Sequence, residues 1–201
     1  MNIYDDGDFF AAYSSMARSQ DGLEAAGEWH QLRPLFPDLR KKRMLDLGCG
    51  YGWHSEYAAQ IGAAYVLGID ASARMLEEAR FNHAHGQIEY RHCRIEEYEF
   101  PPETFDFVFS NLALHYVESL EWVYRGIYRT LHQGGVFLFN IEHPAFTAGV
   151  RQEWVYNEAG EALYWPIDDY FIAGERETVF LGKSVKKHYH SPHGGVGGRN
   201  P

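Results

Sequence analysis

The chain has 201 residues, of which 45% are hydrophobic and 23% charged, and its formal net charge is −10. This length suits one domain with a substantial core and is short for two. The negative charge argues against nucleic acid or an anionic membrane as a partner, because both attract basic surfaces. No apolar run approaches the roughly 20 residues of a membrane span. The acidic N-terminus and two unpaired cysteines, Cys49 and Cys93, predict a cytoplasmic protein with reduced thiols.

Residues 1–40 are predicted to form a helical lead-in to the domain. Apolar side chains recur there at three- and four-residue spacing, which is typical of a helix that buries one face. Pro34 and Pro37 are expected to end this helical pattern. The stripe consists of Leu23, Ala26, Trp29 and Leu32.

Apolar runs and helical patterns alternate through the middle of the chain. Such alternation predicts βαβ units and a mostly parallel sheet with helices on both faces. Gly134 and Gly135 are expected to stop the last of these helices before the fifth strand. The predicted strands are 44–47, 65–70, 88–91, 105–110 and 136–141, and the predicted helices are 53–60, one that starts at Ser72, and 119–131.

The regular alternation ends after Pro144. Residues 154–156 and 163–165 flank a turn and predict a hairpin, and 178–190 read as extended chain around Gly182. Aromatic residues are frequent in this part, and core positions explain them better than an acceptor pocket or a lid. They include Trp154, Tyr156, Tyr164, Trp165, Tyr170 and Phe171. We therefore expect one domain over 1–190, with 142–190 as a lid-like insert, and a disordered tail over 191–201.

A glycine-rich loop, Asp46-Leu-Gly48-Cys49-Gly50-Tyr-Gly52, lies between a predicted strand and a predicted helix. Glycines there let the chain turn tightly and let a ligand approach the backbone. Asp70 follows Gly50 by twenty residues, at the end of the next strand. A carboxylate in that place accepts hydrogen bonds from ribose hydroxyls, so the loop predicts a nucleoside site.

The kind of nucleoside follows from two side chains. A dinucleotide site needs a third glycine, which would fall at Trp53. Asp46 would repel a diphosphate but suits a ligand with an ammonium and a sulfonium, unless it only caps the amides of the loop. A nicotinamide-dependent oxidoreductase is therefore disfavoured.

Four separated blocks now make the chain recognisable: the loop 46–52, Gly68-Ile-Asp70-Ala-Ser72, Met75-Leu76 and Phe105-Asp-Phe-Val-Phe-Ser110. Together they resemble the class I S-adenosylmethionine-dependent methyltransferase family. The resemblance implies a Rossmann-like, doubly wound sheet of seven strands, of which only the last is antiparallel. It also implies S-adenosyl-L-methionine as the cofactor. The residues that it places at the cofactor are Asp46 and Gly48 at the methionine part, Asp70 at the ribose, and Ala71 and Met75 against the adenine, with Cys49, Gly50 and Asn111 as further candidates.

One position departs from the family pattern. Members carry an acid after the third strand that accepts from the adenine amino group, and Arg94 stands there in this chain. Arginine has no acceptor, so the backbone of Ile95 would have to read the adenine. Arg18, in the lead-in, is a candidate clamp for the methionine carboxylate, with a solvated surface arginine as the alternative.

Two histidines follow strands at the edge where parallel sheets bind ligands. His115 comes after the fourth predicted strand and His143 after the fifth. Each is a candidate base for a methyl acceptor, and each is also explained as an ordinary loop residue. Much of the catalysis can come from alignment of the reactants. We therefore expect a methyltransferase that acts on a small-molecule acceptor, or a binding protein of the same fold that has lost transfer. No metal site is expected.

The C-terminal part lacks the pattern that completes the family's sheet. After Ile141 we find neither the expected helix nor two closing strands, so these are predicted to be missing or replaced. The fifth strand would then keep an unpaired edge, which invites pairing with a second copy of the chain and predicts a homodimer.

Overall fold

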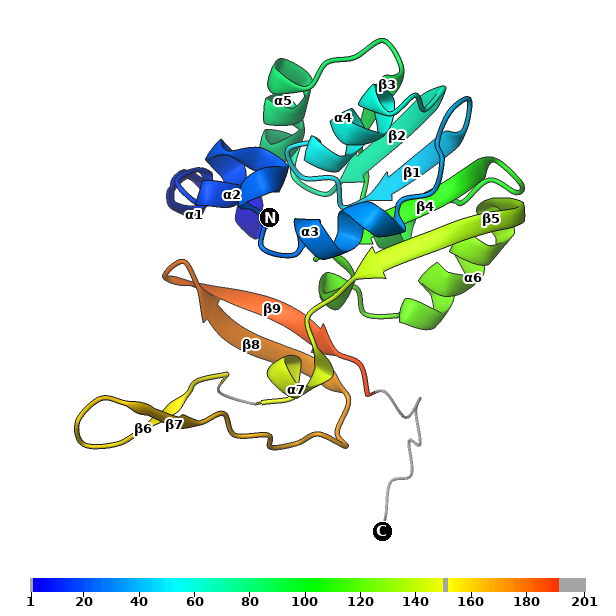
Figure 1. Cartoon of the computed structure of the whole chain (residues 1–201). Coiled ribbons are helices and arrows are strands. Elements are labelled where there is room, and N and C mark those ends of the chain that lie inside the picture. Colours follow the sequence, from blue (N-terminus) through cyan, green and yellow to red (C-terminus); the bar gives the residue numbers. More distant parts are fainter. Residues whose placement is uncertain (1, 150–151, 192–201) are drawn as a thin grey trace.

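The computed structural model describes residues 2–149 and 152–191. Five parallel strands form one sheet in the order β3-β2-β1-β4-β5, with helices packed against it (Figure 1). This arrangement confirms the predicted Rossmann-like fold. The strands are β1 (Arg43–Leu47), β2 (Tyr65–Asp70), β3 (Ile88–His92), β4 (Phe105–Asn111) and β5 (Leu131–Asn140).

Alternation along the strands gives the sheet two buried faces. Met44 of β1 packs into one apolar cluster, whereas its neighbours Leu45 and Leu47 pack into the other. Trp29 and Ala58 cover the first face, and Val123 and Ile127 cover the second face. The helices that follow the strands are α4 (Trp53–Gln60), α5 (Ala73–Asn82) and α6 (Leu120–Thr130), with the 3-10 turns η4 (Ile95–Glu97) and η5 (Leu114–Tyr116) between them.

Side-chain caps fix where two of these helices begin. The Ser72 hydroxyl accepts from the Met75 amide at 3.2 Å before α5, and Ser119 accepts from the Trp122 amide at 3.4 Å before α6. The predicted N-cap at Ser72 is therefore confirmed, and it places the start of α5 directly after the end of β2.

The N-terminal lead-in is helical but broken into short pieces. Gly22, with φ of 67°, and the extended backbone at Met16 interrupt the predicted helical pattern. The predicted apolar stripe still packs on the sheet, with Trp29 and Leu32 buried. The pieces are η1 (Ile3–Asp5), α1 (Gly7–Ser14), α2 (Ala17–Gln20), η2 (Gly22–Ala25), α3 (Trp29–Leu32) and η3 (Arg33–Leu35).

The glycine pair before the fifth strand has a different role from the one we expected. Helix α6 ends at Thr130, before the glycines, and β5 begins immediately at Leu131. The pairing with β4 then shifts, because Phe105 faces Leu131 whereas Phe107 faces Val136. Gly134, with φ of 79°, lies in this irregular part of β5 rather than at the helix end.

Two antiparallel hairpins follow the sheet. The first was predicted as a hairpin, and the second as extended chain around Gly182, where the turn lies. Neither joins the five-stranded sheet in the described part of the chain, so β5 is paired on the β4 side only. In the described residues, these two separate hairpins therefore stand where the family pattern would have strands that close the sheet. Figure 1 shows the β8–β9 hairpin between the sheet and the smaller β6–β7 hairpin. The elements are α7 (Pro144–Thr147), β6 (Val155–Tyr156), β7 (Ala162–Tyr164), β8 (Gly174–Phe180) and β9 (Lys183–Tyr189).

Most of the aromatic residues beyond Phe146 are not core residues, which corrects that expectation. Trp154, Tyr156, Tyr164 and Phe171 are between 49% and 80% exposed. Strands of two and three residues are too short to form a layer that buries such rings. The predicted tail, apart from Ser191, lies outside the described residues. No helix in the described ranges is long and apolar enough to cross a membrane.

Candidate functional site

The glycine-rich loop turns tightly against the end of β2. The amides of Gly48 and Cys49 both donate to the Ile69 carbonyl, at 2.9 and 3.0 Å. Gly48 has a φ of 75°, and a Cβ built on it would lie 2.3 Å from the Cβ of Ala113. Only glycine fits here, because the backbone is left-handed and the neighbouring loop is in contact.

Asp70, at the end of β2, fixes the conformation of this loop through hydrogen bonds. Its Oδ2 accepts from the Gly50 amide at 2.9 Å, and its Oδ1 accepts from the Ser72 amide at 2.8 Å. Burial raises the pKa of Asp70, against the lowering effect of these two amides. A carboxylate oxygen can accept more than one hydrogen bond, so both oxygens remain able to bind hydroxyls.

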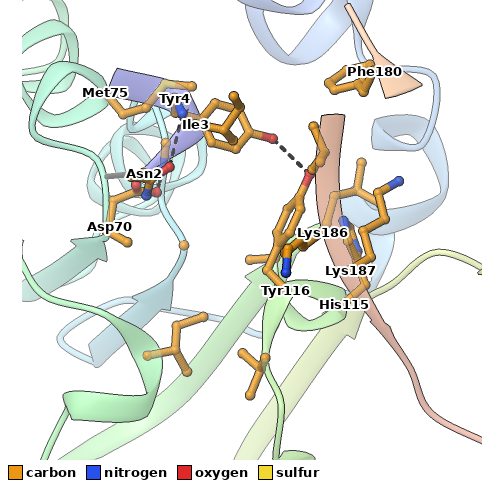
Figure 2. A pocket seen from close by; sticks show the side chains of 18 of the residues that line it. Asn2, Ile3, Tyr4, Asp70, Met75, His115, Tyr116, Phe180, Lys186 and Lys187 are labelled. Atoms are coloured by element: carbon orange, nitrogen blue, oxygen red, sulfur yellow. Dashed lines mark hydrogen bonds between the residues drawn. The ribbon is translucent and has the colours of Figure 1, made fainter. Parts of the chain in front are cut away.

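A cavity of about 840 Å³ opens at this end of the sheet. Figure 2 shows Asp70 and Met75 on one side of it and His115, Lys186 and Lys187 on the other. The cavity thus joins the predicted cofactor residues to the predicted acceptor side. The predicted residues that line it are Arg18, Gly48, Gly50, Asp70, Ala71, Met75, Ile95, Asn111 and His115.

Asp46 and Cys49 lie behind the loop and are not among the described residues that line the cavity. Asp46 is 1% exposed, and its Oδ2 accepts from the Ser55 hydroxyl at 2.7 Å. Burial raises the pKa of Asp46 to about 7, against that hydrogen bond, and the Asp70 carboxylate adds to the rise. Burial likewise raises the pKa of the Cys49 thiol. These positions favour a supporting role over direct contact with a ligand.

His143 also lies apart from the cavity. It is the N-cap of α7, and its Nδ1 accepts from the Ala145 amide at 3.1 Å. This local hydrogen bond gives His143 a structural role, which agrees with the alternative that it is an ordinary loop residue.

Arg18 and Asn111 both contact Glu28, an acidic residue that the sequence did not single out. The Glu28 carboxylate forms an ion pair with the Arg18 guanidinium and accepts from Asn111 Nδ2 at 2.9 Å. Arg18 keeps further N–H groups for a ligand, since a guanidinium has five. Nothing in the local sequence around Glu28 marks it, because the contact joins segments 83 residues apart.

Arg94 lines the cavity next to Ile95, as the departure from the family pattern implied. Its guanidinium lies 3.3 Å from Glu96 and 3.9 Å from Glu97. Ile95 itself is buried in the core that supports the loop.

His115 is the predicted acceptor-side histidine that lines the cavity. This side chain is 3% exposed, and its Nδ1 has no hydrogen-bond partner among the described residues. Its Nε2 lies 3.9 Å from Glu142 Oε1, to which Lys187 Nζ approaches within 2.5 Å. Burial lowers the pKa of His115 to about 3, with Lys187 and His190 adding to the effect, so the imidazole is neutral near pH 7.

Two covers close the cavity, and both lie in segments that the sequence marked, the lead-in 1–40 and the lid-like insert 142–190. Their residues Tyr4, Lys186 and Lys187 were not singled out from the sequence. One is the N-terminal segment, whose Tyr4 hydroxyl lies 3.0 Å from the Tyr116 hydroxyl (Figure 2). The other is the β8–β9 hairpin, which carries Lys186 and Lys187. They meet where Lys183 lies 3.3 Å from Asp6 and 3.5 Å from Asp8. The signal that could have located them is the pairing of an acidic N-terminus with a lysine at a hairpin turn.

The residues present fit S-adenosylmethionine. Gly48 and Gly50 line the cavity without side chains, so the loop backbone is open to a ligand there, and Asp70 offers acceptors for ribose hydroxyls. Met75 offers an apolar wall at the start of α5. Arg18 and Glu28 supply opposite charges suited to a carboxylate and an ammonium.

Comparison with known proteins gives the same answer. The model of a methyltransferase domain matches residues 45–139. A protein of Listeria monocytogenes assigned as an S-adenosylmethionine dependent methyltransferase is 45% identical, with a TM-score of 0.79 over 84% of this chain and 79% of that one. The chain belongs to the class I S-adenosylmethionine-dependent methyltransferases.

Further matches agree with this family. The S-adenosylmethionine dependent methyltransferase of Mesorhizobium loti is 40% identical, with a TM-score of 0.78 over 86% of this chain and 78% of that one. A ubiquinone biosynthesis O-methyltransferase of Neisseria meningitidis is 34% identical over 122 residues, which are 55% of this chain. The chain spans about half the length of that relative, 51%. The methyltransferase is an enzyme whose cofactor is S-adenosylmethionine and which requires a methyl acceptor.

Proposed function

We propose that this methyltransferase methylates a hydroxyl group of a small-molecule acceptor held between Asp70 and His115. The observation that carries the proposal is the buried, unpartnered Nδ1 of His115 in the same cavity as the cofactor residues. The cavity volume of about 840 Å³ is in the usual range of small-molecule sites, roughly 300–1,000 Å³.

Cofactor binding is assigned to residues on the sheet side of the cavity. Asp70 accepts from the ribose hydroxyls, and Ala71, Met75 and the Ile95 backbone enclose the adenine. Gly48, Gly50 and Asn111 line the methionine end, where Arg18 binds the carboxylate. When bound, S-adenosylmethionine supplies an electrophilic methyl group. The protein's main contribution to that reaction is to align the acceptor oxygen and exclude water.

His115 is proposed as the base. A neutral imidazole accepts the proton that the acceptor's hydroxyl loses as its oxygen gains the methyl group. The Glu142 carboxylate, 3.9 Å from Nε2, then stabilises the imidazolium that results. His143, which caps α7, has no part in this proposal.

The oxygen acceptor has independent support. The similar protein from Neisseria meningitidis is an O-methyltransferase. An oxygen nucleophile that carries a proton also explains why an uncharged base is kept beside the cofactor site.

The test is transfer from labelled S-adenosylmethionine to a panel of phenols and alcohols, with His115→Gln compared with His143→Asn. His115→Gln should lose transfer by about 10²–10⁴-fold while S-adenosylhomocysteine still binds. His143→Asn, which keeps a good N-cap, should retain it. The acid limb of the wild-type pH profile should lie well below 6.5, the usual pKa of histidine.

Three results would count against the proposal. Equal rates for both variants would remove His115 as the base. Transfer to amines alone would replace the hydroxyl acceptor. Tight binding of S-adenosylhomocysteine without transfer to any acceptor would favour the alternative, a binding protein of this fold that has lost catalysis.

A further inference from the structure

A second cavity of about 990 Å³ lies beside the first. It is formed by segments that are separate in the sequence: the start of α6, the end of β5, α7, and the chain that enters and leaves the β8–β9 hairpin. The residues that shape it include Leu120, Tyr124, Ile141, Pro144, Ala173 and His190. It is therefore as large as the cavity that holds the proposed reaction.

The two cavities share one wall. His115, Glu142 and His188 line both of them. A ligand that extends from one cavity into the other therefore passes directly beside His115, the proposed base. The second cavity therefore adjoins the proposed acceptor site at these three residues.

Polarity changes across this wall. On the wall itself, the Nδ1 of His115 and the Oε2 of Glu142 are buried without a partner among the described residues. Beyond it, Leu120, Ile141 and Pro144 present aliphatic side chains, and Glu118, Ser119 and Arg125 also line the second cavity. The aliphatic side chains offer an apolar surface to the part of a ligand that lies beyond its reacting end.

The far side of the second cavity ends in aromatic residues. Tyr124 packs against Phe137 and Phe139 with ring centroids 6.0 and 6.2 Å apart, and Tyr128 on the same helix is 87% exposed. Apolar side chains of this kind suit an apolar ligand body. The charged residues of the lining include Glu118 and the ion pair of Glu121 with Arg125 at 2.6 Å.

We infer that the acceptor has an apolar chain, which lies in the second cavity while its hydroxyl lies beside His115. The inference rests on the proposed function, because it uses His115 to fix the reacting end. It names the acceptor's class: an amphipathic molecule with a hydroxyl head and an extended apolar body.

The test uses a series of 4-alkylphenols, from methyl to octyl, with calorimetry on the protein saturated with S-adenosylhomocysteine. Affinity should rise with chain length by about fourfold for each methylene that becomes buried. Long and short members should compete for one site. Because the readout is binding, it is independent of whether transfer occurs.

Ala173→Trp should fill the second cavity without disturbing the core, since Ala173 is exposed. We expect it to abolish the gain with chain length and to leave 4-methylphenol and S-adenosylhomocysteine unaffected. Val179→Trp is the matched control, since Val179 lies on the same hairpin, is 75% exposed and lines neither cavity. It should preserve the gain.

Two results would overturn the inference: affinity that does not change with chain length, or a gain that persists equally in Ala173→Trp. Failure of the proposed function has a different signature, namely loss of S-adenosylhomocysteine binding or transfer that does not depend on His115. The two failures are therefore distinguishable.

Discussion

Two regions of the molecule are packed differently: the end of the sheet at the glycine-rich loop, and the segment after β5, called here the cover, which spans residues 141–149 and 152–191. In β1, Met44, Leu45 and Leu47 are fully buried, and the loop after β1 is fixed by amide hydrogen bonds to Ile69 and Asp70. In the cover, large apolar side chains such as Phe171 and Val179 are 80% and 75% exposed.

The difference bears on the two binding tasks that we propose. On the proposed cofactor side, backbone amides at the strand ends and the Asp70 carboxylate are fixed by the sheet, and Arg18 of the lead-in adds to them. The proposed acceptor side combines His115 and Glu142, which follow β4 and β5, with the hairpin that Lys183 joins to Asp6. In this proposal, recognition of the acceptor rests in part on the more exposed hairpin, where side chains change with little effect on the core.

The largest effect is expected from Gly48→Ala, which tests whether the loop backbone sets the cofactor side. The new Cβ would lie 2.3 Å from Ala113 at a φ of 75°. We expect a loss of about 2–5 kcal/mol in the free energy of unfolding, from overpacking and left-handed strain, together with loss of S-adenosylhomocysteine binding. Chemical denaturation and calorimetry measure the two.

Gly50→Ala is the control for Gly48→Ala. Gly50 also has a positive φ, 53°, but a Cβ there would meet nothing within 4 Å. Only the strain of about 1–2 kcal/mol should remain. Equal losses in both variants would mean that backbone strain, and not contact with Ala113, makes glycine necessary in this loop.

A smaller, pH-dependent effect is expected from Asp46→Asn in the ligand-free protein. The pKa of Asp46 is about 7 in the folded chain, above its ordinary value of 3.8, so folding retains a proton. Stability from this group is complete below pH 3.8 and is lost as pH rises to 7. Asparagine does not titrate, so the free energy of unfolding of the variant should not fall in this way. Relative to the wild type it should rise as pH rises, by at most about 4 kcal/mol.

Asp106→Asn should show the opposite sign. Burial raises the pKa of Asp106, but hydrogen bonds from the Arg43 amide and Lys42 outweigh it, and the net pKa is lowered. The ionised Asp106 carboxylate stabilises the fold above its ordinary pKa, and this contribution is lost as pH falls. The variant should therefore be less stable to unfolding than the wild type at neutral pH. Thermal melts from pH 2 to 8 measure both variants, because the Asp106 effect is lost only below pH 3.8. Parallel curves for wild type and Asp46→Asn would contradict the assignment of Asp46.

The smallest effect concerns the open edge of β5. Val136 and Phe139 are each 42% exposed there, and no described strand pairs with this edge. We expect weak association of two copies through it, seen by light scattering across a concentration series. Val136→Lys should reduce association, because lysine blocks edge pairing. A wild-type monomer at every concentration, with a cooperative and high melting temperature, would contradict this prediction.

The sequence by itself determined the five parallel strands and, through its resemblance to a family, the cofactor. Apolar strands alternating with helices predicted the sheet, and the loop 46–52 with Asp70 predicted a nucleoside site. Gly48, Gly50 and Asp70 line one cavity because parallel strands bring their carboxyl ends to one edge, so residues that follow strands become neighbours. The same reasoning placed His115 beside the cavity.

Only the tertiary structure decided the rest. Asp46 turned out to lie behind the loop and His143 to cap α7, although both follow strands as the pattern requires. Glu28, Tyr4 and Lys187 join the site through contacts with Asn111, Tyr116 and Glu142, residues far from them along the chain. The sequence has no periodicity that encodes such contacts. They arise when a lead-in segment and a hairpin pack over the sheet, and that packing is set by the whole fold and not by any local pattern.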